Sequence, residues 1–387
     1  MFHRVIEVFT KNGEDNVFAS LIFQPQEVCF LLDQNDPSAM PRFMNTAQFL
    51  KRKIEGIKVT CREIDFGKML VIDKALEALL DGAVLDIGGG EDRIKLPLLN
   101  YSLSHNLAIC YFDMENESII MMNTKEEIKD VKFPVLSIEE IIQLAGGELY
   151  QVNPQDLPQQ SHHHKAIMRI ALHNIKAWNG FSDYLSYVFS HYAKGSLKVE
   201  NAPMKIRDTN GHTRNCDKAI FSQLTTNGIL KNVHMKNNRL TFEVADDSVL
   251  NLMVRVGDVL EEHLYFELVQ SKCFDEVVLS GKIDWSNHQS YAITVENEID
   301  LIARRGRQIF FISCKSGVIK NEYINEIIVM AKRFGTAECV AVLATMDVLE
   351  ENGEVIKERC RYMDCLLIDG KDIEKKRAIR CLRSRFK

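Results

Sequence analysis

The chain has 387 residues, of which 46% are hydrophobic and 26% are charged, and its net charge is −6. This composition indicates a folded protein of about two or three domains and excludes a disordered chain, a collagen-like repeat and a disulfide-stapled miniprotein. The ten cysteines are scattered without a Cys-x-x-Cys pair, and no signal-peptide pattern or apolar run of membrane length is found; we therefore expect a reduced, cytoplasmic protein with no membrane contact and no structural zinc.

The first part of the chain alternates short apolar runs with segments of helical periodicity. Strand–helix alternation with short polar breaks predicts an α/β domain with a Rossmann-like, mostly parallel sheet and helices on both faces. In chain order we expect strands over 5–9, 28–32, 58–64 and 84–87, helices starting near 17 and over 43–54, 70–80 and 93–103, and a hairpin of 107–112 with 118–122.

A segment rich in Pro, Gln and His, 151–165, is typical of a linker. We interpret its tandem histidines, His162, His163 and His164, as an exposed polar loop, because adjacent residues cannot all face one metal ion. The segment 166–250 resembles a helical, winged-helix-like module, and a spacer or dimerisation element is the alternative. Its expected elements are helices over 181–192 and 218–230 and a hairpin of 233–235 with 240–244.

The last part of the chain, 251–387, changes pattern and predicts a second α/β domain. Its order is one helix, three strands, a helix and a strand. These elements are expected over 256–271, 276–279, 292–302, 308–314, 322–334 and 339–343.

A tight turn around Gly306 joins two of these strands into a hairpin. Alternation places Glu298 and Asp300 on one face of the first strand, and Ser313 and Lys315 on one face of the second. Asp300 and Ser313 are about equally far from the turn, so a carboxylate and an ammonium converge at one end of the sheet. An ion pair at the sheet rim explains this pattern as well as a catalytic site does.

Phosphodiester hydrolysis uses groups of this kind. A divalent cation held by carboxylates activates water and neutralises phosphate charge, and an adjacent lysine stabilises developing negative charge. The helix over 256–271 offers a further carboxylate, Glu261 or Glu262, because one of the two must point toward the sheet.

A glycine-rich segment, 86–92, lies between an expected strand and an expected helix. Its three glycines let a ligand approach backbone N–H groups at a helix N-terminus, while Glu91 and Asp92 suit ribose hydroxyls or base amines better than polyphosphate. The loop over 10–16 follows the first strand, so both loops lie at the carboxyl edge of the sheet, where open α/β sheets bind ligands. A ligand-free tight turn is one alternative, and a dinucleotide-binding metabolic enzyme is another, which leaves 250–350 unexplained.

Since the net charge is negative, any nucleic-acid contact must be local. Two segments qualify as phosphate contacts: the turn 304–307, with three arginines, and the tail 371–387, with eight Lys or Arg against two Asp or Glu. A solvated or frayed C-terminal helix is the alternative for the tail.

The order of elements in the last part, with Glu261, Asp300 and Lys315 at their places in it, resembles the PD-(D/E)xK restriction-endonuclease-like superfamily. Together with the N-terminal α/β pattern, it is similar to CRISPR-associated nucleases of the Card and Can type, in which such a domain follows a CRISPR-associated Rossmann-fold (CARF) sensor domain. The chain departs from the superfamily at Ser313, where an Asp or Glu is expected two residues before the lysine.

The resemblance implies roles for individual residues. It implies catalysis by Glu261, Glu298, Asp300 and Lys315, with Mn²⁺ or Mg²⁺ held by Glu261, Asp300 and the backbone carbonyl near Cys314. It implies that cyclic oligoadenylate, in the form of cyclic tetra-adenylate, binds across the two-fold axis of a homodimer. The residues implied to bind this ring are Thr10, Asn12, Gly13, Asp15, Asn16, Gly88, Gly89, Gly90, Glu91 and Asp92.

The expected organisation is therefore a sensor domain over 1–150, a linker over 151–165, a spacer over 166–250 and a nuclease domain over 251–387. The expected function is cleavage of single-stranded RNA or DNA by a metal-dependent endonuclease that cyclic oligoadenylate activates in type III CRISPR antiviral defence. The alternative is a ligand-gated nucleic-acid-binding regulator with an inactive nuclease remnant, for which Ser313 is the best support.

Overall fold

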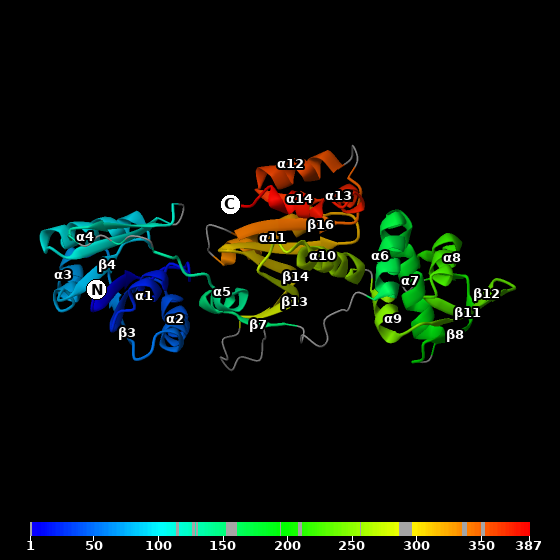
Figure 1. Cartoon of the computed structure of the whole chain (residues 1–387), viewed down its shortest axis with the longest axis horizontal. Coiled ribbons are helices and arrows are strands. Elements are labelled where there is room, and N and C mark those ends of the chain that lie inside the picture. The colour runs from blue at the N-terminus through cyan, green and yellow to red at the C-terminus, as the bar shows by residue number, and fades with distance from the viewer. Residues whose placement is uncertain are drawn as a thin grey trace. The chain divides into compact units, whose positions relative to one another are not determined.

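The structure, a computed structural model, describes residues 2–113, 116–125, 128, 131–151, 161–193, 195–207, 211–255, 257–285, 296–334, 339–349 and 353–387 (Figure 1). The chain divides into two compact units. The first unit contains Met1–Leu149, Ile283–Asn297 and Lys332–Cys339, and the second contains Tyr150–Lys282, Glu298–Ala331 and Val340–Lys387. Within the described ranges, none of the helices combines the length and the apolar character that crossing a bilayer requires.

The first unit is built on a sheet in which every neighbouring pair of strands is parallel except the last, β5 with β6. The spatial order is β3-β2-β1-β4-β5-β6, so the direction of strand addition reverses between β1 and β4. Ligands bind at such a switch point in open α/β sheets. The strands are β1 (Arg4–Val8), β2 (Glu27–Asp33), β3 (Lys58–Ile64), β4 (Ala83–Asp86), β5 (Ala108–Asp113) and β6 (Ser118–Met122).

The core of the first unit confirms the α/β fold class predicted from the alternation of apolar runs. Ile6, Leu31 and Leu85 of the central strands are fully buried, as are Leu76 and Leu98 of the helices packed on them. The continuous apolar runs of β1 and β2 reflect a sheet that is covered on both faces. The helices are α1 (Phe18–Phe23), α2 (Ala39–Lys53), α3 (Met69–Glu77), α4 (Asp92–Ser104) and α5 (Ile138–Leu144), and the short strand β7 (Glu148–Tyr150) follows.

The middle of the chain contains the expected helices and hairpin, and a further helix precedes them. The hairpin β11–β12 is extended by β8 into an antiparallel sheet of order β11-β12-β8, and β9 pairs with β10. The elements are α6 (His162–His173), α7 (Ile175–Tyr192), β8 (Lys198–Pro203), β9 (Lys205–Arg207), β10 (Thr213–Asn215), α8 (Lys218–Thr226), β11 (Leu230–Lys236), β12 (Arg239–Val244) and α9 (Asp247–Val254).

The structure corrects the interpretation of the tandem histidines as an exposed loop. They form the first turn of α6, where the Ser161 hydroxyl accepts a hydrogen bond from the backbone N–H of His164 at 3.2 Å. His164 is buried, and its Nδ1 lies 2.8 Å from the same hydroxyl. Ser161 is therefore the N-cap of α6, and its hydroxyl accepts a hydrogen bond from a first-turn N–H group that would otherwise lack a partner. The loop interpretation overlooked this capping signal. Residues 152–160 of the expected linker lie outside the described residues.

The C-terminal part of the second unit is an α/β layer with strand order β17-β16-β15-β14-β13. Its core is continuous with that of the middle helices, so 166–250 and 251–387 pack around one apolar cluster. The expected strand residues 292–295 lie outside the described residues. The elements are α10 (Asp258–Ser271), β13 (Glu276–Asp284), β14 (Glu296–Arg305), β15 (Gln308–Lys315), α11 (Asn321–Arg333), β16 (Cys339–Thr345), α12 (Glu354–Tyr362), β17 (Cys365–Ile368), α13 (Gly370–Glu374) and α14 (Ala378–Arg383).

The basic tail is packed rather than frayed. Ala378 and Leu382 of α14 are buried, and the Phe386 ring packs edge-on against Phe310 and Phe274 with centroids 5.9 and 5.6 Å away. Two apolar residues one helical turn apart and a terminal aromatic ring thus fix a segment whose charge suggested a solvated helix.

Candidate functional site

The hairpin β14–β15 brings Asp300 to the residues expected to face it. The two strands are antiparallel with Leu301 opposite Ile312, which places Asp300 and Ser313 at the next position. The Ser313 hydroxyl donates to Asp300 Oδ2 at 3.3 Å, and the backbone N–H of Cys314 donates to the same oxygen at 2.5 Å. Asp300 is therefore held in place by the strand beside it.

Lys315 completes the expected juxtaposition at the end of β15. Its Nζ lies 3.7 Å from Asp300 Oδ2 and 5.3 Å from the centroid of the Tyr323 ring. The strand residues that precede it, 309–312, are fully buried, whereas the Lys315 side chain is 29% exposed. The ammonium group thus lies at the rim of the core, between a carboxylate and an aromatic ring, where both a charge partner and solvent access are available.

Of the two helix glutamates, Glu261 is the one near Asp300. Burial raises the pKa of Glu261 to about 8, and the neighbouring carboxylates of Asp300, Asp258 and Glu298 act in the same direction. Glu262 instead faces α6, with its Oε2 3.9 Å from His164 Nε2. Successive residues of a helix point about 100° apart, so only one of the two can face the hairpin.

Asp258 is a carboxylate of this region that the sequence analysis did not select. It lies three residues before Glu261 on α10, and burial followed by the charge of Glu298 raises its pKa, while Arg255 at 3.8 Å acts in the opposite direction. The i, i+3 spacing was the available signal, since such residues share a helix face. Glu298 itself is exposed on β14.

The donor set around Asp300 has the chemistry that a divalent metal ion requires. Asp258, Glu261, Glu298 and Asp300 offer carboxylate oxygens, the ligands preferred by Mg²⁺ and Mn²⁺. The pKa of Glu261 is raised first by burial and then by the neighbouring carboxylates, and a bound cation would relieve the repulsion among these carboxylates. As they stand, no three acidic, His or Cys side chains of the described ranges are close enough together to hold an ion. The Cys314 thiol is buried and its pKa is well above the usual range, first through burial and then through Asp300 and Glu261. Because hard cations prefer oxygen ligands, the backbone oxygen of Cys314 suits Mg²⁺ or Mn²⁺ better than this thiol does.

The raised pKa of Glu261 predicts a pH-dependent stability of the metal-free protein. The folded protein binds this proton more tightly than the unfolded chain, so its stability should fall as pH rises from about 4.5 to about 8 and then level off. Glu261→Gln should flatten this fall, as thermal unfolding in chelator at pH 5 to 9 would show. Glu326→Gln on the exposed face of α11 is the matched control, and equal slopes for wild type and Glu261→Gln would contradict the prediction.

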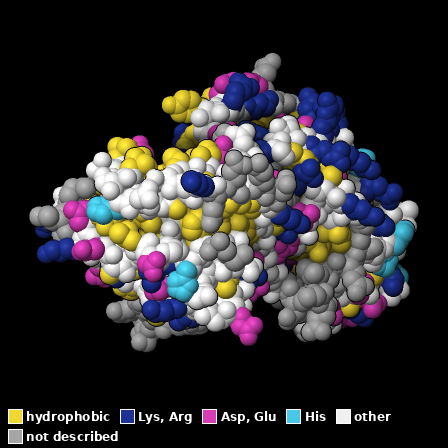
Figure 2. Space-filling view, turned by 60° about the vertical axis from the view of Figure 1, so that its left-hand side comes forward, with side chains coloured by type: hydrophobic (Ala, Val, Ile, Leu, Met, Phe, Trp, Pro, Cys, Tyr) yellow, Lys and Arg dark blue, Asp and Glu magenta, His cyan; other side chains and the backbone are white. Residues whose placement is uncertain are grey.

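The arginine-rich turn lies at the other end of the same hairpin. Arg305 pairs with Gln308 beside the turn, and five residues of strand separate it from Asp300, or roughly 16 Å. Arg304 is already engaged by Glu276 at 3.1 Å and Asp275 at 3.4 Å. On the face that Figure 2 shows, Lys and Arg side chains gather over one part of the surface while Asp and Glu are scattered, so the basic charge is local despite the negative total.

In the first unit, the loops after β1 and β4 touch each other as the sequence analysis expected. A Cβ added at Gly89 would lie 2.5 Å from Thr10 Cγ2, and one added at Gly90 would lie 2.9 Å from Val8 Cγ1. Gly90 also has a φ of +88°, which disfavours other residues. The glycines therefore allow the two loops to close over the switch point between β1 and β4.

Hydrogen bonds within the first loop fix its shape. The Thr10 N–H donates to Asn16 Oδ1 at 2.8 Å, and Asn16 Nδ2 donates back to the Thr10 carbonyl at 3.1 Å. Asn16 is buried, and a Cβ at Gly13 would lie 2.6 Å from Leu144 Cβ. Of the residues expected to bind the ligand, Asn16 and Gly13 are thus engaged in the loop's own packing, whereas Asn12 is partly exposed.

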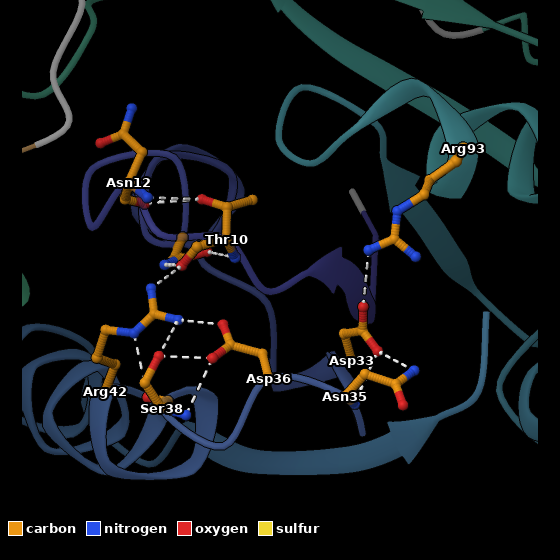
Figure 3. A network of polar contacts seen from close by, with 9 residues as sticks. Thr10, Asn12, Asp33, Asn35, Asp36, Ser38, Arg42 and Arg93 are labelled. Carbon is orange, nitrogen blue, oxygen red and sulfur yellow. Dashed lines mark hydrogen bonds and ion pairs between the residues drawn. The ribbon is translucent and has the colours of Figure 1, made fainter. Parts of the chain in front are cut away.

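Two arginines that the sequence analysis did not select lie at the same edge (Figure 3). Arg42 of α2 donates to the Thr10 carbonyl at 3.1 Å and pairs with Asp36 at 2.6 Å. Arg93, in the first turn of α4, pairs with Asp33 at the end of β2 at 3.0 Å and with Glu91 at 2.7 Å. Arg93 directly follows the glycine segment, so the sequence could have predicted it as part of this site. Arg42 comes to the site only through the packing of α2 on the sheet.

Two buried acids, Glu7 and Asp86, lie beneath these loops, and a third acid, the half-buried Asp15, belongs to the first loop itself. Glu7 and Asp86 are register partners on β1 and β4, and burial raises the pKa of both well above the usual carboxylate range. Burial also raises the pKa of Asp15 to about 6, against the effects of Asn12 and Lys95. At pH 7 the raised pKa values keep Glu7 largely neutral and Asp86 partly neutral, whereas Asp15, with a pKa of about 6, is mostly ionised, so the buried acids add less negative charge to this edge than its composition suggests.

No family model and no curated protein sequence matches the chain. Among solved structures, it is similar to the protein VC1899 from Vibrio cholerae, with 13% sequence identity and a TM-score of 0.70 over 98% of this chain and 97% of that one. It is also similar to Can2 from Sulfobacillus thermosulfidooxidans, solved in complex with cyclic tetra-adenylate, with 15% identity and a TM-score of 0.67 over 99% and 97% of the two chains. The chain shares the fold of both proteins. At such identities the likeness concerns the fold, and function must be argued from the sites.

Proposed function

We propose that this protein is a metal-dependent endonuclease that cyclic oligoadenylate activates, acting on single-stranded RNA or DNA in type III CRISPR defence. The observation that carries the proposal is the approach of Lys315 Nζ to within 3.7 Å of Asp300, with Glu261 nearby, at the open end of the β14–β15 hairpin. The likeness to Can2, whose solved complex contains cyclic tetra-adenylate, supports the activator.

The chain's own residues have separable tasks in this proposal. Asp300, Glu261 and one of Asp258 or Glu298 would hold Mg²⁺ or Mn²⁺, which when bound supplies an activated water and neutralises phosphate charge. Lys315 stabilises negative charge that develops on the phosphate. The Cys314 N–H holds Asp300 through Oδ2, which leaves its second oxygen, Oδ1, for the metal.

The proposed sensor site is the loop pair at the switch point of the first unit. The backbone N–H groups of Gly89 and Gly90 and the guanidinium groups of Arg42 and Arg93 suit an anionic ring, while the Gly88 N–H is donated to Asp86. The raised pKa values of the buried Glu7 and Asp86 beneath them lower the repulsion. We assign binding to Thr10, Asn12, Asp15 and the segment 88–92, in a homodimer that shares one ring. Activation requires that the ring bind the active arrangement more tightly than the resting one.

Cleavage assays test the proposal directly. Purified protein with Mn²⁺ or Mg²⁺ should cut labelled single strands of RNA or DNA when cyclic tetra-adenylate is added and leave them intact without it. Cutting that does not depend on the ring would refute the switch. Absence of cutting with either ion, together with ring-dependent binding of nucleic acid, would establish the regulator instead.

Ser313→Asp should strengthen the site, because it restores the acidic residue that the superfamily has two positions before the lysine. We expect the metal concentration for half-maximal cleavage to fall about tenfold, since affinity for hard cations follows the number of ligand charges. Ser316→Asp adds the same charge just after the end of β15, outside the strand face that carries Asp300 and Ser313, and is the control. An unchanged or higher metal requirement for Ser313→Asp would show that Asp258 or Glu298 already supplies the missing ligand.

A ligand-gated regulator with an inactive nuclease remnant remains the second candidate. Two observations favour it: Ser313 replaces an acid, and among the described ranges no three potential ligand side chains are assembled for a metal. In that case Lys315 and Asp300 are a structural ion pair.

A further inference from the structure

A cavity of about 400 Å³ lies in the second unit, beside α6 and apart from the Asp300 site. It is formed where α6 packs beside α10 and α13 (Figure 1). His263 lines it from α10, two residues after Glu261, which is roughly 200° around the helix. The cavity and the Asp300 site therefore lie on opposite sides of α10, and its volume is in the range of small-molecule sites, about 300–1,000 Å³.

The floor of the cavity is apolar. Ala166, Met168 and Ile373 are buried, and Leu172 is half-buried. An apolar floor favours a ligand with a flat or apolar part. The binding free energy then becomes more favourable in proportion to the apolar area that the ligand buries against the floor.

The rim is basic because one face of α6 carries basic side chains. His162, Lys165, Arg169 and His173 follow one another at intervals of three or four residues, so they share this face, and Lys376 adds a further cation. Glu374 is the one carboxylate among the described lining residues. Lys165 and Arg169 are about one turn, or ~6 Å, apart along the axis, so both reach a single phosphate group.

These cations are available to a ligand. Lys165 and Lys376 form no ion pair with a described residue and are exposed. Arg169 donates through Nη2 to Asn227 Oδ1 at 3.0 Å, which orients the guanidinium and leaves its other donors free to turn toward the cavity. At the inner end, the buried Nε2 of His263 makes no hydrogen bond of good geometry with the described residues, although Glu267 Oε1 lies 3.4 Å away.

We propose that this cavity binds a free nucleoside monophosphate. The phosphate binds Lys165 and Arg169 through charge-assisted hydrogen bonds, with Lys376 close by, and the base lies on the apolar floor beside the imidazole rings. Nothing in this inference depends on nuclease activity or on the sensor loops, so it stands or falls separately from the proposed function.

Calorimetry on the full chain with uridine 5′-monophosphate tests the inference. The uridine nucleotide is chosen because the sensor loops are proposed to bind an adenine nucleotide ring, so an adenine nucleotide could bind at both sites. We expect saturable binding to wild type and at least about tenfold weaker binding to the double variant Lys165→Ala, Arg169→Ala, because each change removes a charged hydrogen-bond donor. Lys176→Ala on the adjacent helix α7 removes a lysine outside the cavity and should bind as wild type does.

Titrations with uridine alone and with inorganic phosphate alone separate the contribution of the apolar floor from that of the basic rim. Uridine and inorganic phosphate should each bind more weakly than uridine 5′-monophosphate. No saturable binding at millimolar nucleotide, or equal binding by wild type and the double variant, would overturn the site. Phosphate that binds as tightly as the nucleotide would overturn the role of the apolar floor and with it the assignment to a nucleotide.

Discussion

Asp300→Asn should abolish ring-dependent strand cleavage, with a loss of at least about 10³-fold in rate, because the change removes both a metal-ligand charge and the partner of Lys315. Lys315→Ala should cause a loss of similar size. Cleavage of a labelled single strand at saturating ring and metal is the measurement. The fold should survive the substitution of Asp300, because asparagine keeps the shape of the side chain and an oxygen that can accept the Cys314 N–H.

The paired variants Glu261→Gln and Glu262→Gln provide the sharpest control. They remove the same charge from adjacent residues of one helix, but only Glu261 lies near Asp300, whereas Glu262 faces His164. Glu261→Gln should slow cleavage about 10²-fold or more, and Glu262→Gln should leave it within a few-fold of wild type. Equal effects of the two variants would contradict the assignment of Glu261 to the site, and full activity of Asp300→Asn would contradict the nuclease mechanism itself.

Phe310→Ala should destabilise the second unit by about 3–5 kcal/mol, the usual cost of deleting a buried aromatic side chain. Phe310 is fully buried in β15, and its ring packs edge-on against Phe274 at 5.5 Å and Phe386 at 5.9 Å. Three aromatic side chains thus join the hairpin, the segment after α10 and the C-terminal tail. Chemical denaturation monitored by a probe in the second unit measures the loss.

The control for this variant is Val318→Ala, since Val318 is 78% exposed and its truncation should change stability by less than about 0.5 kcal/mol. A loss below about 1 kcal/mol for Phe310→Ala would show that the aromatic contacts of the tail are not formed in solution. Removal of the tail from residue 384 onward should then also have little effect, although Phe386 would be lost.

The parts of the structure that sequence alone predicts are those controlled by local periodicity. Alternation in β14 and β15 places Asp300 opposite Ser313 and beside Lys315, because a strand repeats every two residues and a tight turn leaves one register. The same reasoning predicts the strand–helix order of the first unit and the contact between the loops after β1 and β4.

The parts that sequence did not predict depend on packing between distant segments. Arg42 of α2 donates a hydrogen bond to the Thr10 carbonyl. This contact depends on how α2 is rotated about its axis on the sheet, which hydrophobic periodicity does not predict. Ser161, the N-cap of α6, lies in a polar, proline-containing stretch. The composition of this stretch predicted a loop, although a serine at this position is also a helix-starting signal. The basic tail is held by the buried Ala378 and Leu382 and by Phe386, whose partner rings come from two other segments.

By itself, the sequence determined the α/β fold class, the convergence of a carboxylate and a lysine on one hairpin, and the pair of polar loops at one sheet edge, because each follows from strand geometry over a few residues. Strand and helix periodicity left Glu261 and Glu262 open and only the family resemblance favoured Glu261, whereas the tertiary structure shows that Glu261 lies near Asp300. The tertiary structure also added Asp258, Arg42 and Arg93 to the two candidate sites and formed the basic cavity beside α6. The physical reason is that the direction a helix presents to its neighbours is set by the fit of whole apolar faces, which no short stretch of sequence specifies.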